Sequence, residues 1–204
     1  MKIRGLPPNQ TDMLQEIVNI AMGQAADSLA RVFDCFVRLS VPRIALIEAS
    51  RIGDCMAALV KDDTPITAVR QAFHDDLSGE AIALFSADSY RGLSTLMDFP
   101  DLEPQSEEEQ LLDVSNILVG ACLNGIAEQL SANLSFSPPS LIAQNTTARE
   151  LLTPNSLPWD YALQVEVNFS LENRDFMSHV IIMMPQDAVG SLQHSLEQFL
   201  ESVA

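Results

Sequence analysis

Hydrophobic residues recur at helical spacing in two long stretches of the chain. In residues 11–33 and again in residues 111–134, apolar side chains return every three or four positions. This period places them on one face of an α-helix. We therefore predict two long amphipathic helices, the first capped by Thr11 or Asp12.

Strand-like patterns follow each predicted helix. Residues 35–41 alternate apolar and polar side chains up to Pro42, which cannot donate to a sheet. Residues 43–60 are ambiguous short segments. The remaining predicted elements are strands at 66–76 and 79–86, a helix at 87–99, strands at 134–137, 161–173 and 176–185, and a helix at 187–200.

The order of these elements repeats along the chain. Aligning Asn19 with Asn116 also aligns Gly23 with Gly120 and Pro42 with Pro139, each by 97 residues (116−19, 120−23, 139−42). Such self-similarity predicts one domain, 1–204, made of two repeats at about 10–99 and 106–204 and related by a pseudo-twofold axis. The alternative is coincidence between similar helices.

The predicted fold class is α+β. Because the strands come as hairpins without short crossover helices, we expect a mostly antiparallel sheet. The two long helices are expected to pack together on one of its faces.

The charge of the chain excludes some partners. Its 28 acidic and 11 basic residues give a net charge of −17, which disfavours nucleic acid. We find neither a long uninterrupted apolar stretch nor the apolar core of a signal peptide, and predict a cytoplasmic protein without membrane insertion. The three widely spaced cysteines predict reduced thiols, and the scattered histidines predict no metal site.

Each long predicted helix carries one polar stripe. Intervals of four and three residues place the members of a stripe on one line along a helix. The first stripe contains a carboxylate and a carboxamide one turn apart, and so does the second. The stripes are Asp12, Glu16, Asn19 and Gly23 in the first helix, and Glu109, Asp113, Asn116 and Gly120 in the second.

A carboxylate beside a carboxamide cannot hold a phosphate alone, but it can complete a site that another protein brings. An acyl phosphate already held by Mg²⁺ and a lysine chiefly needs a water aligned for in-line attack. A carboxamide can accept from and donate to that water, and a carboxylate can pair with the lysine.

The spacing of the first stripe resembles a family signature. Asp12, Glu16, Asn19 and Pro42 match the pattern of the CheC, CheX and FliY phosphatases: Asp or Ser, three residues, Glu, two residues, Asn, twenty-two residues, Pro. In the second half Asn116 and Pro139 keep their spacing. There Asp113 stands where the family has Glu, and Glu109 stands where it has Asp or Ser. A signature in each half resembles CheC more than the other members.

The resemblance implies a phosphatase of phosphorylated CheY-like receiver domains. Glu16 would pair with the receiver lysine and Asn19 would orient the attacking water, with Asp113 and Asn116 in the same roles at a second site. The protein would need no cofactor of its own, since the receiver would supply Mg²⁺. We expect the second site to be weaker, because Asp is one methylene shorter than Glu.

Other roles follow less directly from the same stripes. Asp12 and Glu109 are interpreted as partner-binding contacts or as solvated charges at the helix starts. Gly23 and Gly120 suggest close helix packing, which we favour, or clearance for a partner.

Two other functions are weighed against the phosphatase. One is a binding module that holds a receiver, a CheD-type deamidase or a flagellar switch component without hydrolysis. The other, a small-molecule hydrolase, needs a self-contained site that the sequence does not offer.

Overall fold

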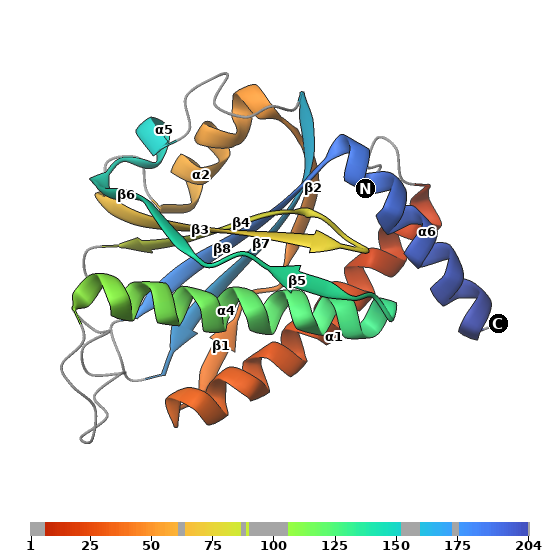
Figure 1. The fold of residues 1–204 in the computed structure, drawn as a ribbon, viewed down its shortest axis with the longest axis horizontal. Coiled ribbons are helices and arrows are strands. Elements are labelled where there is room, and N and C mark those ends of the chain that lie inside the picture. Colours follow the sequence, from red (N-terminus) through yellow and green to blue (C-terminus); the bar gives the residue numbers. More distant parts are fainter. Residues whose placement is uncertain are drawn as a thin grey trace.

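A computed structural model describes residues 7–60, 64–86, 89, 106–151, 160–172 and 176–203. Two long helices, α1 and α4, are the largest helical elements (Figure 1). The described elements are α1 (Pro8–Phe33), β1 (Val37–Leu39), β2 (Arg43–Glu48), η1 (Ala49–Arg51), α2 (Ile52–Val60), β3 (Ile66–Asp75), β4 (Gly79–Ser86), α4 (Glu107–Leu130), β5 (Leu134–Phe136), β6 (Ser140–Thr146), α5 (Ala148–Leu151), β7 (Tyr161–Leu171), β8 (Met177–Pro185) and α6 (Gln186–Val203).

One eight-stranded sheet forms the centre of the fold. Its strand order is β1-β7-β8-β4-β3-β5, with β2 also on β7 and β6 also on β3. Each of these strand pairs is antiparallel. The prediction of an α+β fold with a mostly antiparallel sheet is confirmed.

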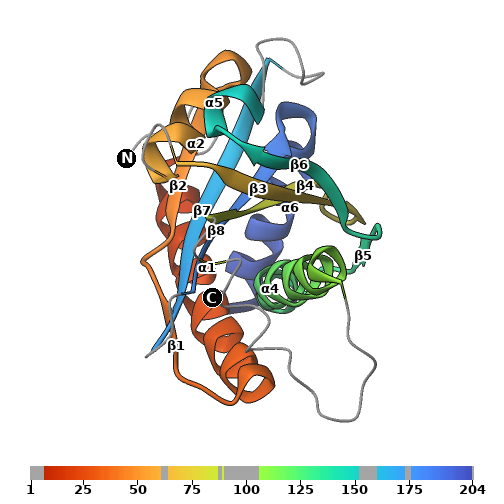
Figure 2. The ribbon, with the colours of Figure 1, turned by 90° about the vertical axis from the view of Figure 1, so that its left-hand side faces the viewer.

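Helices cover both faces of the sheet. Figures 1 and 2 show α1, α4 and α6 on one side and α2 and α5 on the other. The larger core lies between the sheet and the helices α1, α4 and α6. A smaller core of twelve buried residues lies between the sheet and the helices α2 and α5. The expected packing of the two long helices together on one face is what the structure has.

Exchanging β1–β4 with β5–β8 returns the same set of strand pairings. One pair of hydrogen bonds repeats as well. Ser40 exchanges backbone and side-chain bonds of 3.0 Å with Asn168, and Ser137, 97 positions later, does the same with Ala72. A duplicated unit would produce this regularity, but the duplication itself stays a prediction.

The start of α1 differs from the prediction. The helix begins at Pro8 after an N-cap at Pro7, and no side chain caps it. Proline suits this position because its missing N–H would have no partner in the first turn. Thr11 instead lies buried within the helix and donates from Oγ1 to the carbonyl oxygen of Pro7 at 3.2 Å. The predicted capping by Thr11 or Asp12 is therefore wrong.

Other element predictions fare differently. The ambiguous residues 43–60 form β2, η1 and α2, while β6 and α5 were not predicted. The helix predicted at 87–99 lies outside the described residues apart from Ser89.

α4 is long and apolar enough to cross a membrane, by length and composition alone. A buried core helix passes the same test, and 56% of the most apolar window of α4 is buried. Its contacts with α1 and the sheet account for that composition.

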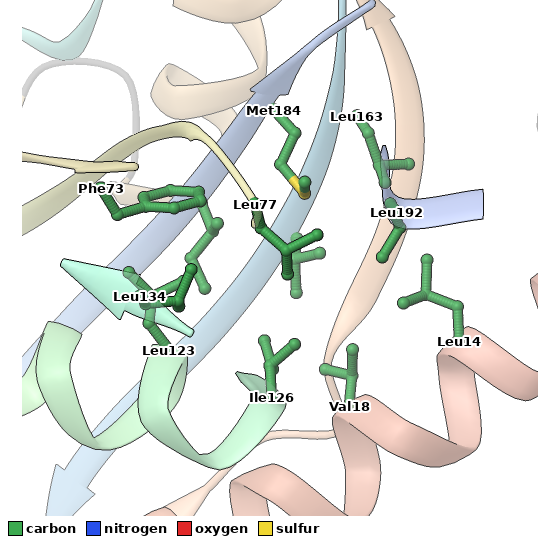
Figure 3. A pocket seen from close by; sticks show the side chains of 12 residues that line it. Leu14, Val18, Phe73, Leu77, Leu123, Ile126, Leu134, Leu163, Met184 and Leu192 are labelled. Carbon is green, nitrogen blue, oxygen red and sulfur yellow. The ribbon is translucent and has the colours of Figure 1, made fainter. Parts of the chain in front are cut away.

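A cavity of about 20 Å³ lies between α1, α4, α6 and the sheet (Figure 3). Its twelve lining residues are all apolar, among them Leu14, Phe73 and Met184. A cavity without polar partners does not hold water well. It offers no groups for chemistry, so it is a packing gap in the core and not a candidate site.

Candidate functional site

The polar stripe of α1 lies on the surface. Glu16 and Asn19 are exposed, as are Asp12 and Gly23 at its two ends. The apolar face of the same helix is buried against the sheet and α4, with Leu14, Ile17, Val18 and Ala21 each at most 2% exposed. The amphipathic pattern thus fixes the rotation of α1 and turns the carboxylate and carboxamide outward.

The stripe of α4 has the same orientation. Glu109, Asp113 and Asn116 are exposed, and Gly120 is half-buried. The opposite face packs into the core through Leu111, Val114, Leu118 and other apolar residues. Both asparagines predicted from the sequence are therefore accessible to another molecule.

A glutamine joins Asn19 to the proline of the signature. The Nε2 of Gln15 donates to the Oδ1 of Asn19 at 3.4 Å and to the carbonyl oxygen of Pro42 at 3.2 Å. The chain segment before β2 is thus held beside Asn19. The sequence indicates only a strand end at Pro42, and the structure adds this contact of its carbonyl group.

A different glutamine contacts Asn116. Gln71 projects from β3 towards α4 and is 2% exposed. Its Nε2 donates to the Oδ1 of Asn116 at 2.8 Å and to the carbonyl oxygen of Ser137 at 3.0 Å. The carboxamide of Asn116 is therefore held from the side of the sheet, while Asn116 as a whole stays exposed to solvent.

Sequence reasoning missed both glutamines, although each left a signal. Gln15 precedes Asn19 by four residues, so it adjoins the polar stripe. In β3, residues of the same parity as Gln71 face the core, including Val69 and Phe73. A polar side chain among them requires a hydrogen-bond partner.

The two stripe glycines do not pack against another helix. Among the described residues, and apart from the backbone of its own helix, a Cβ atom at Gly23 would meet no atom within 4 Å, and one at Gly120 would meet only the side chain of Asn124 at 3.9 Å. The close approach of α1 and α4 is at Gly125, where a Cβ atom would lie 2.8 Å from the carbonyl oxygen of Ala21. The packing explanation favoured for Gly23 and Gly120 is wrong.

Glu109 has a structural role at the start of α4. Its carboxylate accepts from the backbone N–H of Ser106 at 2.8 Å and from its hydroxyl at 2.9 Å. The Oγ of Ser106 accepts in turn from the backbone of Glu109, which completes a capping box. These bonds lower the pKa of Glu109. The partner-binding roles of Glu109 and Asp12 stay predictions.

Nucleophilic chemistry has little support in the described part of the chain. Burial raises the pKa of the Cys122 thiol far above its ordinary value, which keeps the sulfur protonated. Burial also raises the pKa of Cys55. What the surface does offer is a carboxylate and an oriented carboxamide on each long helix.

The model of the CheC-like family matches residues 10–46, which contain the whole first signature. Over 200 residues the chain is 24% identical to the CheY-P phosphatase CheC of Bacillus subtilis, covering 92% of the chain and 94% of that protein. The resemblance to the CheC family is confirmed. A second member, the flagellar motor switch phosphatase FliY of B. subtilis, is 22% identical over 95% of the chain, which spans 52% of FliY.

Solved structures agree with the fold. The crystal structure of Thermotoga maritima FliY superposes with a TM-score of 0.69 at 18% identity, covering 96% of this chain and 99% of that one. The FliM middle domain of H. pylori superposes with a TM-score of 0.62 at 9% identity, over 93% of this chain and 99% of that one. Because FliY and FliM share the fold, the fold alone does not assign an activity.

Proposed function

We propose that the chain is a protein phosphatase that hydrolyses the aspartyl phosphate of a CheY-like receiver domain. The observation that carries the proposal is the exposure of Asn19 and Asn116, each one turn after an exposed carboxylate, on helices whose other faces are buried. The phosphatase names of the family's members support it.

In the proposed reaction, a docked receiver brings the phosphoaspartate, its lysine and Mg²⁺. Glu16 pairs with the lysine, which fixes the register of docking. The carboxamide of Asn19 reaches the space beside the phosphorus and holds a water in line with the scissile bond. Since phosphoryl transfer depends mainly on positioning and electrostatics, this small set of groups is sufficient.

Exposed apolar side chains adjoin the first site. Ile20, next to Asn19, is 42% exposed, and Val41, next to Pro42, is 77% exposed. Apolar side chains beside polar ones are suited to burial against a protein surface. They favour a macromolecular substrate over a small molecule, which would need an enclosed pocket.

The second site uses Asp113 and Asn116 in the same roles. Asp113 is shorter than Glu16, so its carboxylate reaches less far towards the receiver lysine. We therefore expect weaker docking at the second site and a larger share of activity from the first. A CheD-type deamidase as a further partner, and a cytoplasmic location, stay predictions.

The test is the decay of a phosphorylated receiver with wild type, Asn19→Ala, Asn116→Ala and the double variant. We expect Asn19→Ala to lose most activity, Asn116→Ala less, and the double variant all of it. Asn124→Ala is the matched control, because it changes an exposed asparagine of α4 two turns beyond Asn116. Greater loss from Asn116→Ala than from Asn19→Ala would reverse the ranking of the sites.

The binding-module alternative gives a different result in the same assay. A chain that only holds a receiver would bind it without accelerating loss of phosphate, whatever residue stood at 19 or 116. Equal decay with and without the chain, together with measurable binding, would establish that alternative.

A further inference from the structure

The buried amide of Gln71 has an unusual position for a core-facing residue of β3. It is 2% exposed, and its Oε1 is buried without a hydrogen-bond partner among the described residues. A buried acceptor left unpaired costs on the order of 1–3 kcal/mol. Packing therefore does not explain why a glutamine stands there.

The hydrogen bonds of Gln71 determine which way the amide of Asn116 points. A backbone carbonyl can only accept, so Ser137 requires the Nε2 of Gln71 to face it. The same Nε2 has a second hydrogen, which it donates to the Oδ1 of Asn116 at 2.8 Å. Asn116 consequently turns its oxygen towards Gln71, and its Nδ2 is free to turn outward.

The same logic applies to Asn19 with a different glutamine. The carbonyl group of Pro42 fixes the Nε2 of Gln15, which donates to the Oδ1 of Asn19 at 3.4 Å. This bond is longer than the one at Asn116, and Gln15 is half-buried where Gln71 is buried. Asn116 is therefore the more firmly held of the two side chains.

Each asparagine has one such glutamine, but the two glutamines come from different elements, α1 and β3, and both lie in the first half of the chain. With the shift of 97 residues, the position in the second half that corresponds to Gln15 is Leu112. In the sheet, Leu39 pairs with Phe169, and Phe136, 97 positions after Leu39, pairs with Phe73. Phe169 therefore corresponds to Phe73, and Val167 corresponds to Gln71. The second half thus has apolar residues at both positions where the first half has a glutamine. At both sites the glutamine Nε2 nevertheless joins the asparagine Oδ1 to a backbone carbonyl oxygen, that of Pro42 at the first site and that of Ser137, two residues before Pro139, at the second.

We propose that Gln71 and Gln15 are positioning residues that fix the carboxamides of Asn116 and Asn19 in one orientation. This inference rests on the proposed phosphatase function. A held carboxamide presents the same donor and acceptor to every attacking water, so the turnover step benefits. Receiver docking depends on the carboxylates, so the receiver concentration at half-maximal rate is unaffected.

The test uses the Asn19→Ala background, in which only the second site acts. Initial rates are measured against the concentration of phosphorylated receiver. We expect Gln71→Met, which keeps the volume and removes the donor, to lower kcat about tenfold with KM unchanged. Gln71→Glu reverses the polarity facing Ser137 and Asn116, and its kcat falls at least as far.

Gln164→Met is the matched control. Gln164 of β7 is also buried, at 5% exposed, and its Oε1 is also unpaired among the described residues, but it lies on the opposite face of the sheet. A loss of kcat that came only from disturbing the sheet would appear in this variant too. We expect its kcat to equal that of Asn19→Ala alone.

If Gln71→Met does not fold, Gln15→Leu in the Asn116→Ala background carries the same test. Gln15 is half-buried on a helix, and leucine occupies the corresponding position of α4. We expect a smaller fall in kcat, because the bond is longer. Unchanged kcat in a folded variant, or an equal fall in the control, would overturn the positioning role. Absence of activity in wild type would instead remove the proposed function.

Discussion

Replacing two helical glycines, Gly23 of α1 and Gly125 of α4, by alanine tests where the two helices pack closely and where they leave open space. Glycine inside a helix is about 0.8–1.0 kcal/mol less favourable than alanine. At Gly23 a new methyl group meets no atom of another described element within 4 Å. We therefore expect Gly23→Ala to raise stability by about 1 kcal/mol, or about 2–4 °C in Tm for a chain of this size.

Gly125 gives the opposite expectation. The added Cβ atom would lie 2.8 Å from the carbonyl oxygen and 3.2 Å from the Cα atom of Ala21. Backbone atoms cannot turn aside as a side chain does, so the two helices must separate. Overpacking of this kind costs about 1–3 kcal/mol, which exceeds the gain in helix propensity.

Thermal and urea unfolding of both variants measures these effects. A lower Tm for Gly23→Ala would refute the open space beside Gly23, and a higher Tm for Gly125→Ala would refute the described contact between α1 and α4. Gly23→Ala also tests the clearance explanation that remains for this residue. We expect it to slow receiver dephosphorylation although the protein is more stable.

Three further predictions concern the second site and the fold. Asp113→Glu completes the second signature, and we expect it to lower the receiver concentration at half-maximal rate in the Asn19→Ala background; no change would show that carboxylate reach does not limit docking. Ser106→Ala removes the N-cap of α4 and should cost about 1 kcal/mol in urea unfolding, whereas Ser106→Asp should keep it. Burial lowers the pKa of His179, whose Nδ1 lies 2.6 Å from the Oδ1 of Asn168. As the pH falls, His179 therefore takes up its proton in the unfolded chain at a higher pH than in the folded one. The free energy of unfolding should keep its full value above about pH 6.5 and decrease below it. His179→Gln should flatten that dependence.

The sequence predicted the elements whose periodicity is long and strong. The recurrence of apolar residues every three or four positions predicted α1 and α4. The alternating or continuous apolar runs with turn residues between them predicted the hairpins β3–β4 and β7–β8. Short elements were not resolved in this way. In α2, β6 and α5 too few residues distinguish a period of 3.6 from one of two.

The candidate site divides along the same line. The exposure of Asn19 and Asn116 follows from the helical stripes. When the apolar face of each helix is buried, the polar stripe that contains the asparagine must face solvent. Their hydrogen bonds to Gln15 and Gln71 do not follow. The bond of Gln71 joins a strand to a helix 45 residues away, and pairing across the fold sets that distance. The packing at Gly125 depends on the crossing point of two helices, which no local pattern specifies.

The central claim is that Asn19 and Asn116 direct hydrolysis of an acyl phosphate on another protein. The most direct measurement is the first-order decay of a ³²P-labelled receiver domain with excess wild type and with the Asn19→Ala, Asn116→Ala double variant. The account predicts faster release of inorganic phosphate with wild type and the receiver's own rate with the double variant. Equal acceleration by both proteins would contradict it.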